Sequence, residues 1–222
     1  MLSRCPLNRG RPNPTGNQIG ADHNYFYSNI FQRSRPDLQA GQGACMTIGN
    51  WSNEGGCVAH HNTYVNNTIY DGTENAIHQC RCTTQPDDPT SNVFKNNLIV
   101  KWSEYGVYQQ ASSGTYPTAQ VWQYNCFWQP GSPTADVLRR AGDGSSPYTV
   151  AEADAAFTGW ASNLQTDPLF VSSNPVLPTD FHLQSTSPVR AAGTPITGIS
   201  GFVDYYGNAW NPTSPSIGAF QY

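Results

Sequence analysis

The sequence predicts an all-β fold, a single-stranded parallel β-helix with long loops, from a repeated segment, two apolar columns and a third strand-like segment. Four segments of the 222-residue chain align without gaps, and each has an Asn or Gln five residues before a second Asn. The second Asn recurs as Asn29, Asn67, Asn97 and Asn125, at intervals of 38, 30 and 28 residues. Such intervals are typical of one solenoid turn plus loops of variable length.

Two columns of apolar residues keep the same place in all four segments. Three residues before the second Asn stand Phe26, Tyr64, Phe94 and Trp122, and two residues after it stand Phe31, Ile69, Ile99 and Phe127. A strand, a one-residue corner and a second strand would place both columns in one core, with the Asn in the left-handed conformation that this residue tolerates. The four corner asparagines are then expected to stack as a hydrogen-bonded ladder, which is a structural feature.

A third strand in each repeat is predicted after a short loop. Segments 44–47, 76–79 and 106–109 align on a small residue followed by an apolar one. Because side chains alternate along a strand, we expect Cys45, Ile77 and Val107 to point inward and Met46, His78 and Tyr108 to point outward. An antiparallel sandwich or a propeller is the alternative, but neither predicts corner asparagines at intervals of one turn.

A single domain is expected, because a chain of this length can bury one full core. Residues 1–20 are interpreted as an irregular lead-in, 21–130 as regular turns, and 161–222 as a terminal turn and tail. The Pro-, Gly- and Ser-rich stretch 131–160 is interpreted as a loop insertion with one short helix at 150–157, N-capped by Thr149. Because the first turn starts late in the chain, self-association or a capping partner is expected at its strand edge.

Composition argues against two classes of partner and favours a secreted protein. Charged residues make up 12% of the chain, with 11 Lys and Arg against 15 Asp and Glu, so there is no basic surface for nucleic acid. No apolar run approaches the roughly 20 residues of a membrane span. The opening residues lack the apolar core of a signal peptide, so a leader is expected to be already absent.

Six cysteines allow either disulfides or a zinc site, and their spacing favours disulfides. They are Cys5, Cys45, Cys57, Cys80, Cys82 and Cys126. The paired C-x-x-C spacing of zinc sites is missing, and an even count in a Lys-poor chain is typical of an oxidising compartment. Cys45 with Cys57 is the first pairing to consider, because a short loop between them costs little to close.

Four short blocks follow the repeats in a fixed order. They are Asp-Pro-Leu-Phe at 167–170, Asp-Phe-His-Leu at 180–183, Ser-Pro at 187–188 and Ile-Gly-Ala at 217–219. With the Asn-cornered repeats, these blocks resemble the C-terminal portion of secreted right-handed parallel β-helix proteins of the pectate-lyase-like superfamily, over roughly residues 20–222. The resemblance implies a right-handed β-helix. It implies polysaccharide lyases, glycoside hydrolases, epimerases and non-catalytic surface proteins alike.

Ionisable residues gather on one expected face, at the loop that leads into the third strand. Four residues beyond each corner Asn stand Arg33, Asp71, Lys101 and Gln129, and seven residues beyond it stand Glu74 and Glu104. His78 and Tyr108 are expected to project from the strands that follow. In a chain so poor in charge, this face is the candidate catalytic site.

Two chemistries and one inert arrangement remain open for this face. An eliminating lyase would draw its acid and base from Lys101, Arg33, His78 or Tyr108, while Asp71 with Glu74 or Glu104 would bind Ca²⁺, the one cofactor considered. A hydrolase would use the carboxylates of Glu74 and Glu104. A surface ladder of ion pairs without chemistry is the alternative.

Aromatic rings beside the loops are candidates for binding sugar. They are Trp51, Trp102, Tyr116 and Trp128, which would either stack on sugar faces or cover the core. The sequence thus predicts a protein that acts on or binds an acidic polysaccharide, with a lyase preferred and a hydrolase open. The alternative is a non-catalytic extracellular module that binds glycan or stacks end to end.

Overall fold

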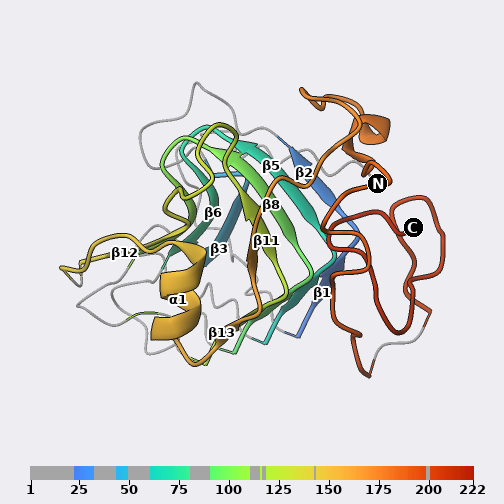
Figure 1. Ribbon diagram of the computed structural model, residues 1–222. Coiled ribbons are helices and arrows are strands. Elements are labelled where there is room, and N and C mark those ends of the chain that lie inside the picture. The colour runs from blue at the N-terminus through green and yellow to red at the C-terminus, as the bar shows by residue number, and fades with distance from the viewer. Residues whose placement is uncertain are drawn as a thin grey trace, which may run out of the picture.

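The computed structural model describes residues 23–32, 44–49, 61–80, 91–110, 116, 119–142, 144–198 and 201–222, and in these parts the protein is predominantly β (Figure 1). The strands form three sheets, and every strand pair within them is parallel. Sheet A contains β1 (Tyr25–Tyr27), β4 (Thr63–Val65), β7 (Val93–Lys95), β10 (Val121–Gln123) and β13 (Trp160–Ala161). Sheet B contains β2 (Ile30–Gln32), β5 (Thr68–Gly72), β8 (Leu98–Trp102), β11 (Cys126–Trp128) and β14 (Leu164–Gln165). Sheet C contains β3 (Met46–Gly49), β6 (Asn75–Cys80), β9 (Tyr105–Gln110) and β12 (Leu138–Ala141).

The chain visits the three sheets in turn, so that each strand pairs with the strand three places along the sequence. One strand from each sheet makes what we call a repeat. In sheet A the register aligns Phe26 with Tyr64, Tyr64 with Phe94, and Phe94 with Trp122, as the sequence predicted. A fifth repeat continues the column with Trp160.

The two apolar columns form the core between the sheets, which confirms their predicted direction. Rings stack face to face along the first column, with centroid distances of 4.9 Å (Phe26 to Tyr64), 4.7 Å (Tyr64 to Phe94), 3.8 Å (Phe94 to Trp122) and 5.2 Å (Trp122 to Trp160). In the second column Phe31, Ile69, Ile99 and Phe127 are all buried. Burial of such side chains contributes roughly 1.5–3 kcal/mol each to folding, so the columns are a major source of stability.

The predicted asparagine ladder is present and has one more rung than expected. The side-chain Nδ2 of Asn29, Asn67, Asn97 and Asn125 donates to Oδ1 of the next rung at 3.0, 3.0, 2.9 and 3.0 Å, and the last acceptor is Asn163. The backbone N–H of each donor rung bonds to the same oxygen. The ladder ends on a carboxylate, because Asn163 Nδ2 donates to Asp154 Oδ1 at 2.7 Å and Asn163 N donates to Asp154 Oδ2 at 3.1 Å.

The left-handed corner residue is the one before each ladder Asn, so the expectation that the Asn itself is left-handed is wrong. Positive φ angles occur at Ser28 (51°), Asn66 (52°), Asn96 (55°), Tyr124 (55°) and Ser162 (58°). With the bend made one residue earlier, the ladder Asn directs both its backbone N–H and its amide along the stack. Asn66 and Asn96, which can adopt this conformation at low cost, turn their side chains outward instead.

The C-terminal tail is fixed to this corner and covers the outer face of sheet B (Figure 1). Asn66 Nδ2 donates to the Ser216 carbonyl at 2.7 Å, and Asn96 Nδ2 donates to the Thr194 carbonyl at 2.8 Å. A second apolar cluster joins outward residues of sheet B to the tail; it includes Ile30, Tyr70, Leu98, Val100, Phe170, Phe181, Val189 and Ile217. Of the three sheets, the described part of the tail therefore covers sheet B.

Sheet C differs from the predicted alignment by one residue in its first strand. Met46 pairs with Ile77 and is only 8% exposed, while Thr47 pairs with His78 and is exposed. The prediction that Met46 points outward is wrong, because a shift of one residue moves a side chain to the opposite face of a sheet. Cys45 is buried as expected, and its Sγ lies 3.3 Å from the Tyr70 carbonyl oxygen.

Stretch 131–160 contains a helix, as predicted, and also a strand that belongs to the repeat pattern. The predicted helix is present as α1 (Val150–Ala156), with a capping box between Thr149 and Glu152. The same stretch holds β12, which pairs with β9 and supplies the third strand of the fourth repeat. The loop interpretation missed this strand because its two central residues are arginines, which hide the apolar alternation.

Two of the six cysteines lie in described parts of the chain with described side chains, and both are thiols. Cys45 and Cys126 are buried and form no disulfide, so the predicted Cys45–Cys57 pairing is wrong in this structure. Burial raises the pKa of the Cys126 thiol to about 12. The side chains of Cys5, Cys57, Cys80 and Cys82 lie outside the described residues.

We expect the carboxylate that ends the ladder to be required for stability. Asp154→Ala leaves two buried donors of Asn163 unsatisfied, which should lower the free energy of unfolding by about 1–3 kcal/mol in urea denaturation. Asp136→Ala is the matched control, since Asp136 is exposed, and should change stability by about 0.5 kcal/mol or less. Equal stability of the two variants would contradict the assigned role of Asp154.

Candidate functional site

The outer face of sheet C carries a row of polar side chains that crosses four repeats. Cα pairing places Thr47, His78, Tyr108 and Arg139 side by side, one from each strand of the sheet. Because alternate residues of these strands fill the core, the row points away from it. We call these four residues the sheet C row.

Two rings meet in the middle of this row. The imidazole of His78 and the phenol ring of Tyr108 lie edge to face, with centroids 5.0 Å apart. Tyr105, three residues earlier on β9, has its ring centroid 6.2 Å from that of Tyr108. His78 is only 2% exposed, whereas Tyr108 and Arg139 are half-buried. Tyr108 and Arg139 are therefore the groups of the row that a ligand reaches first.

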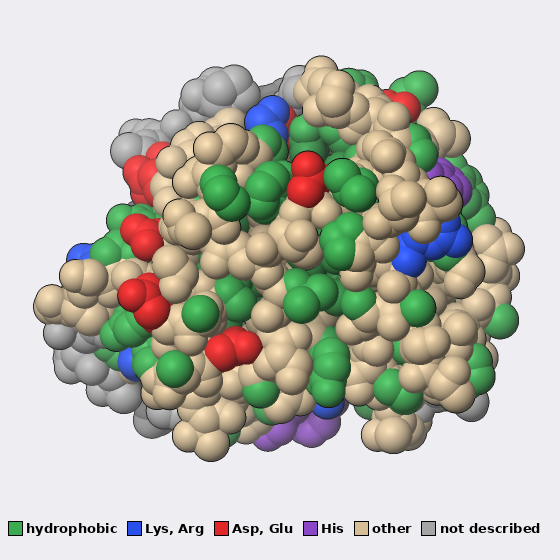
Figure 2. Space-filling view, viewed as in Figure 1, with side chains coloured by type: hydrophobic (Ala, Val, Ile, Leu, Met, Phe, Trp, Pro, Cys, Tyr) green, Lys and Arg blue, Asp and Glu red, His purple; other side chains and the backbone are tan. Residues whose placement is uncertain are grey.

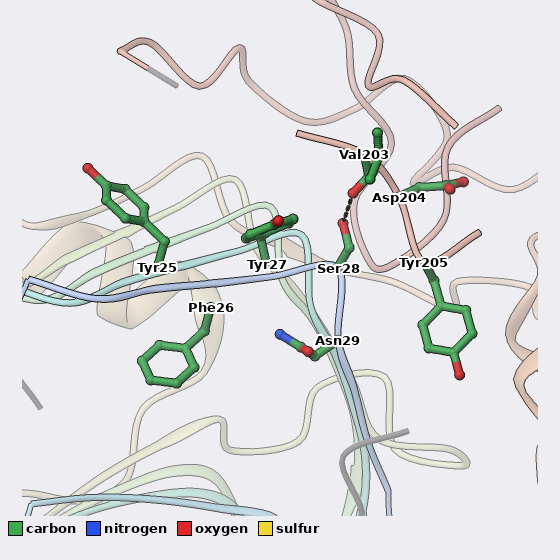
Figure 3. Close-up of a pocket in the computed structure, with 8 residues that line it drawn as sticks. All are labelled: Tyr25, Phe26, Tyr27, Ser28, Asn29, Val203, Asp204 and Tyr205. Atoms are coloured by element: carbon green, nitrogen blue, oxygen red, sulfur yellow. Dashed lines mark hydrogen bonds between the residues drawn. The ribbon is translucent and has the colours of Figure 1, made fainter. Parts of the chain in front are cut away.

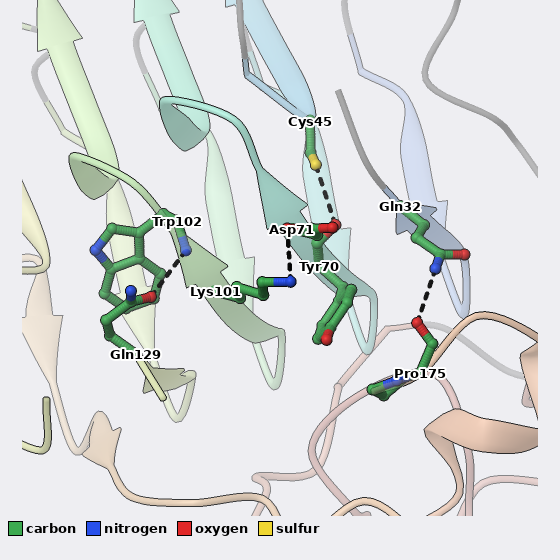
Figure 4. Close-up of polar contacts among 8 residues, drawn as sticks. All are labelled: Gln32, Cys45, Tyr70, Asp71, Lys101, Trp102, Gln129 and Pro175. Atoms are coloured by element: carbon green, nitrogen blue, oxygen red, sulfur yellow. Dashed lines mark hydrogen bonds and ion pairs between the residues drawn. The ribbon is translucent and has the colours of Figure 1, made fainter. Parts of the chain in front are cut away.

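An ion pair occupies the corner that leads into sheet C (Figure 4). Lys101 Nζ lies 3.1 Å from Asp71 Oδ1, and the two side chains are 39% and 17% exposed. Both residues have left-handed backbones, with φ of 62° at Lys101 and 66° at Asp71. The ammonium also lies 5.5 Å from the ring centroid of Tyr70. This is the expected charge column in part, since Arg33 lies outside the described residues.

Glu74 and Glu104 also occupy equivalent positions in neighbouring repeats, as predicted. The backbone N–H groups of Ser103 and Glu104 donate to the Glu74 carbonyl at 3.0 and 2.8 Å, so Glu74 and Glu104 belong to neighbouring repeats. Gln129, in the column of Asp71 and Lys101, accepts a bond from the Trp102 backbone N–H at 2.9 Å (Figure 4). The corner that precedes sheet C thus holds two carboxylates and one ion pair.

A metal at this corner is not favoured by the geometry. The described residues contain no group of three or more His, Cys, Asp or Glu side chains placed to hold a metal ion. Asp71, the candidate calcium ligand, is already paired with Lys101. Calcium binding stays a prediction from the sequence.

The aromatic residues proposed to bind sugar are mostly part of the core or its cover. Trp102 is 3% exposed and Tyr116 is 5% exposed, so neither ring face is open to a sugar. Tyr116 donates its hydroxyl to the Ala141 carbonyl at 2.8 Å, and its ring lies 3.9 Å from the guanidinium carbon of Arg140. Trp128 is partly buried against the second apolar cluster, and Trp51 lies outside the described residues.

Sequence reasoning missed Arg139 and Tyr105, which complete the sheet C row and its surroundings. Arg139 was missed because β12 was interpreted as loop, although it follows Leu138 as Tyr108 follows Val107. On the face that Figure 2 presents, Asp and Glu side chains lie at separate positions, and Lys and Arg atoms gather at the right edge. The sheet C row, which crosses four repeats, is the candidate site.

Comparisons with known proteins do not assign a family. No protein-family model matches the chain, and no curated protein matches it either. Among the described helices, none combines the length and apolar character needed to cross a membrane.

The Asp71–Lys101 pair is expected to contribute little to stability. Ion pairs with this exposure are worth roughly 0–1 kcal/mol, because solvent screens them. A double-mutant cycle with Asp71→Asn and Lys101→Met should give a coupling energy below about 1 kcal/mol by urea denaturation. A coupling energy of about 3 kcal/mol would show that the pair is a structural requirement, and would remove Lys101 from the candidate site.

Proposed function

We propose that this protein is a secreted right-handed parallel β-helix of the pectate-lyase-like kind that binds an acidic polysaccharide across the outer face of sheet C and cleaves it by elimination. The rotation of the chain through three parallel sheets, with every third strand paired, supports the β-helix. The right-handed sense follows the general preference of parallel crossover connections. The resemblance of the tail to secreted β-helix proteins supports the extracellular location.

The sheet C row is the observation that carries the proposal. It runs perpendicular to the strands over four repeats, which at about 4.8 Å per strand is roughly 14 Å between its first and last residues. An extended surface of this kind suits a polymer better than a small molecule. The ring of Tyr108 and the hydroxyl of Thr47 offer both a stacking surface and a hydrogen-bonding group.

The cation in the row, Arg139, favours an acidic sugar chain. Arg139 neighbours Tyr108 in the register, and a guanidinium binds a carboxylate with two parallel hydrogen bonds. Arg139 already donates one bond from Nη1 to the Ser145 carbonyl, which fixes its direction. In this site Arg139 would hold the carboxylate of a uronic acid unit.

Elimination needs an acid and a base beside that carboxylate. A base removes the proton from the carbon next to the carboxyl group, the C–O bond at the neighbouring carbon breaks, and a double bond forms between the two carbons. The departing oxygen takes a proton from the acid. We assign the acid role to Tyr108. The base role falls to His78, whose ring centroid lies 5.0 Å from that of Tyr108 and whose buried imidazole must be uncovered before it can reach a substrate proton.

A binding-only module is the second candidate, and two observations favour it. His78 is almost fully buried, and the ammonium of Lys101 is held by Asp71. In this state the imidazole is closed to a substrate proton, and the ammonium already has an anionic partner. The same row would then recognise the glycan without cleaving it.

Activity and binding assays on one set of variants separate the two candidates. The protein is mixed with polygalacturonate, alginate or a neutral glucan, with and without calcium, and the absorbance of an unsaturated product is followed. Retardation in gels that contain each polymer measures binding. For an eliminating enzyme, Tyr108→Phe should lower turnover at least about 100-fold with stability unchanged. Arg139→Ala should abolish both turnover and retardation.

Matched controls are available for each variant. Tyr124→Phe and Arg190→Ala alter residues on the sheet A corner and in the tail, and should leave both readouts unchanged. Retardation that depends on Arg139 without any unsaturated product would favour the binding-only module. Absence of both product and retardation with all three polymers would contradict the proposed function.

A further inference from the structure

Strand β1 lies at one end of sheet A, and its outer edge faces a slot of about 350 Å³. The slot lies between residues 25–29 on one side and residues 203–205 on the other (Figure 3). Among the described strands, β1 pairs only with β4. One wall of the slot is therefore formed by β1 and the corner that follows it.

The backbone of β1 presents hydrogen-bonding groups to this slot. The Asn24 carbonyl accepts from Thr63 N at 2.8 Å, and Ser28 N donates to the Val65 carbonyl at 3.3 Å. Successive residues of a strand direct their N–H and C=O groups to opposite sides. The groups of Tyr25 and Tyr27 consequently face away from β4, toward the slot.

The aromatic stack of the core also ends at this edge. Phe26 is the first ring of the stack and is half-buried, whereas Tyr64, Phe94 and Trp122 are at most 5% exposed. One face of the Phe26 ring is covered by Tyr64. Its other face is where a further ring would continue the stack, on the side of β1 opposite to Tyr25 and Tyr27 (Figure 3).

The asparagine ladder starts at this edge with Asn29. In every later rung the equivalent Oδ1 atom accepts two hydrogen bonds. Oδ1 of Asn67, Asn97, Asn125 and Asn163 each accepts a backbone N–H and a side-chain Nδ2 from the preceding repeat. No described residue donates to Oδ1 of Asn29. A preceding strand with an Asn in register would supply both donors.

We propose that the slot is a binding site for an extended segment of another protein, which adds to sheet A as a strand parallel to β1. The segment carries an aromatic residue that stacks on Phe26 and, three residues later, an Asn that donates to Asn29 Oδ1. Every repeat of this protein has that spacing, from Phe26 and Asn29 to Trp160 and Asn163. Backbone bonds to Tyr25 and Tyr27 give affinity, and the ring and the amide give specificity.

A second copy of this chain does not present such a strand from its opposite end. At that end the backbone N–H and the Nδ2 of Asn163 donate to Asp154, which lies on helix α1. Head-to-tail stacking of copies would require this contact to break. Of the two occupants, a second copy or another protein, we assign the slot to another protein with an aromatic-x-x-Asn strand.

A synthetic peptide tests the slot directly. The probe is residues 91–102 of this chain, acetylated, amidated and labelled with fluorescein, which contains Phe94 and Asn97 at the required spacing. Fluorescence anisotropy should show saturable binding to the full chain. Peptides with Asn97→Ala or Phe94→Ala should each bind about tenfold more weakly, because the former loses the side-chain Nδ2 donor to Asn29 Oδ1 and the latter loses ring stacking.

Two protein variants locate the site on β1. Tyr25→Pro removes a backbone N–H that faces the slot and should weaken peptide binding about tenfold or more, since Pro is tolerated at edge strands. Tyr25→Ala keeps that N–H and should bind the peptide nearly as well as the unmodified protein. Equal affinity of the Asn97→Ala peptide, or no saturable binding at all, would overturn the proposal. Self-association with rising protein concentration that displaces the peptide would assign the slot to a second copy instead.

Discussion

The asparagine ladder fixes the position of one repeat relative to the next, and the rest of the structure depends on it. Its amides lie in the interior, where an unsatisfied polar group costs about 1–3 kcal/mol. Asn67, Asn97 and Asn125 avoid that cost because each Oδ1 accepts two bonds and each Nδ2 donates two, one along the ladder and one to a carbonyl of the preceding repeat. A shift of one residue between repeats would break all of these bonds at once. The ring stack, which lies three residues before the ladder in every repeat, is a consequence of this fixed register.

The same constraint makes the ends and the faces of the molecule different from one another. At one end Asp154 satisfies the last two donors, while at the other Asn29 keeps an acceptor that the repeat pattern can extend. Sheet B is covered by the tail, which the outward amides of Asn66 and Asn96 hold in place. Sheet C presents Tyr108 and Arg139 on its outer face. The ladder therefore has one end that Asp154 closes and one end that borders the slot. Of the two sheet faces, the tail covers that of sheet B, and that of sheet C carries the candidate site.

The parts of the fold that were predicted correctly are those that each repeat encodes locally. The ladder and the two apolar columns follow from spacings of a few residues around each corner, and helix α1 follows from its Thr149 cap. Sheet C was predicted less well, because loops of variable length precede its strands and only pairing with the neighbouring repeat sets their register. That is why Met46 was assigned to the wrong face and why β12, with Arg139, was interpreted as loop. The burial of Trp102 and Tyr116 likewise depends on contacts between distant segments, which a single repeat does not contain.

Hydrogen exchange of the asparagine side-chain amides, followed by NMR, tests the ladder most directly. Amides that are buried and donate two bonds exchange only when the stack opens, so the Nδ2 protons of Asn67, Asn97 and Asn125 should exchange orders of magnitude more slowly than those of the exposed Asn174. Protection should be similar at all three positions, because one cooperative stack contains them. Exchange as fast as that of Asn174 would contradict the account, since the repeats would then be held in register by something other than these amides.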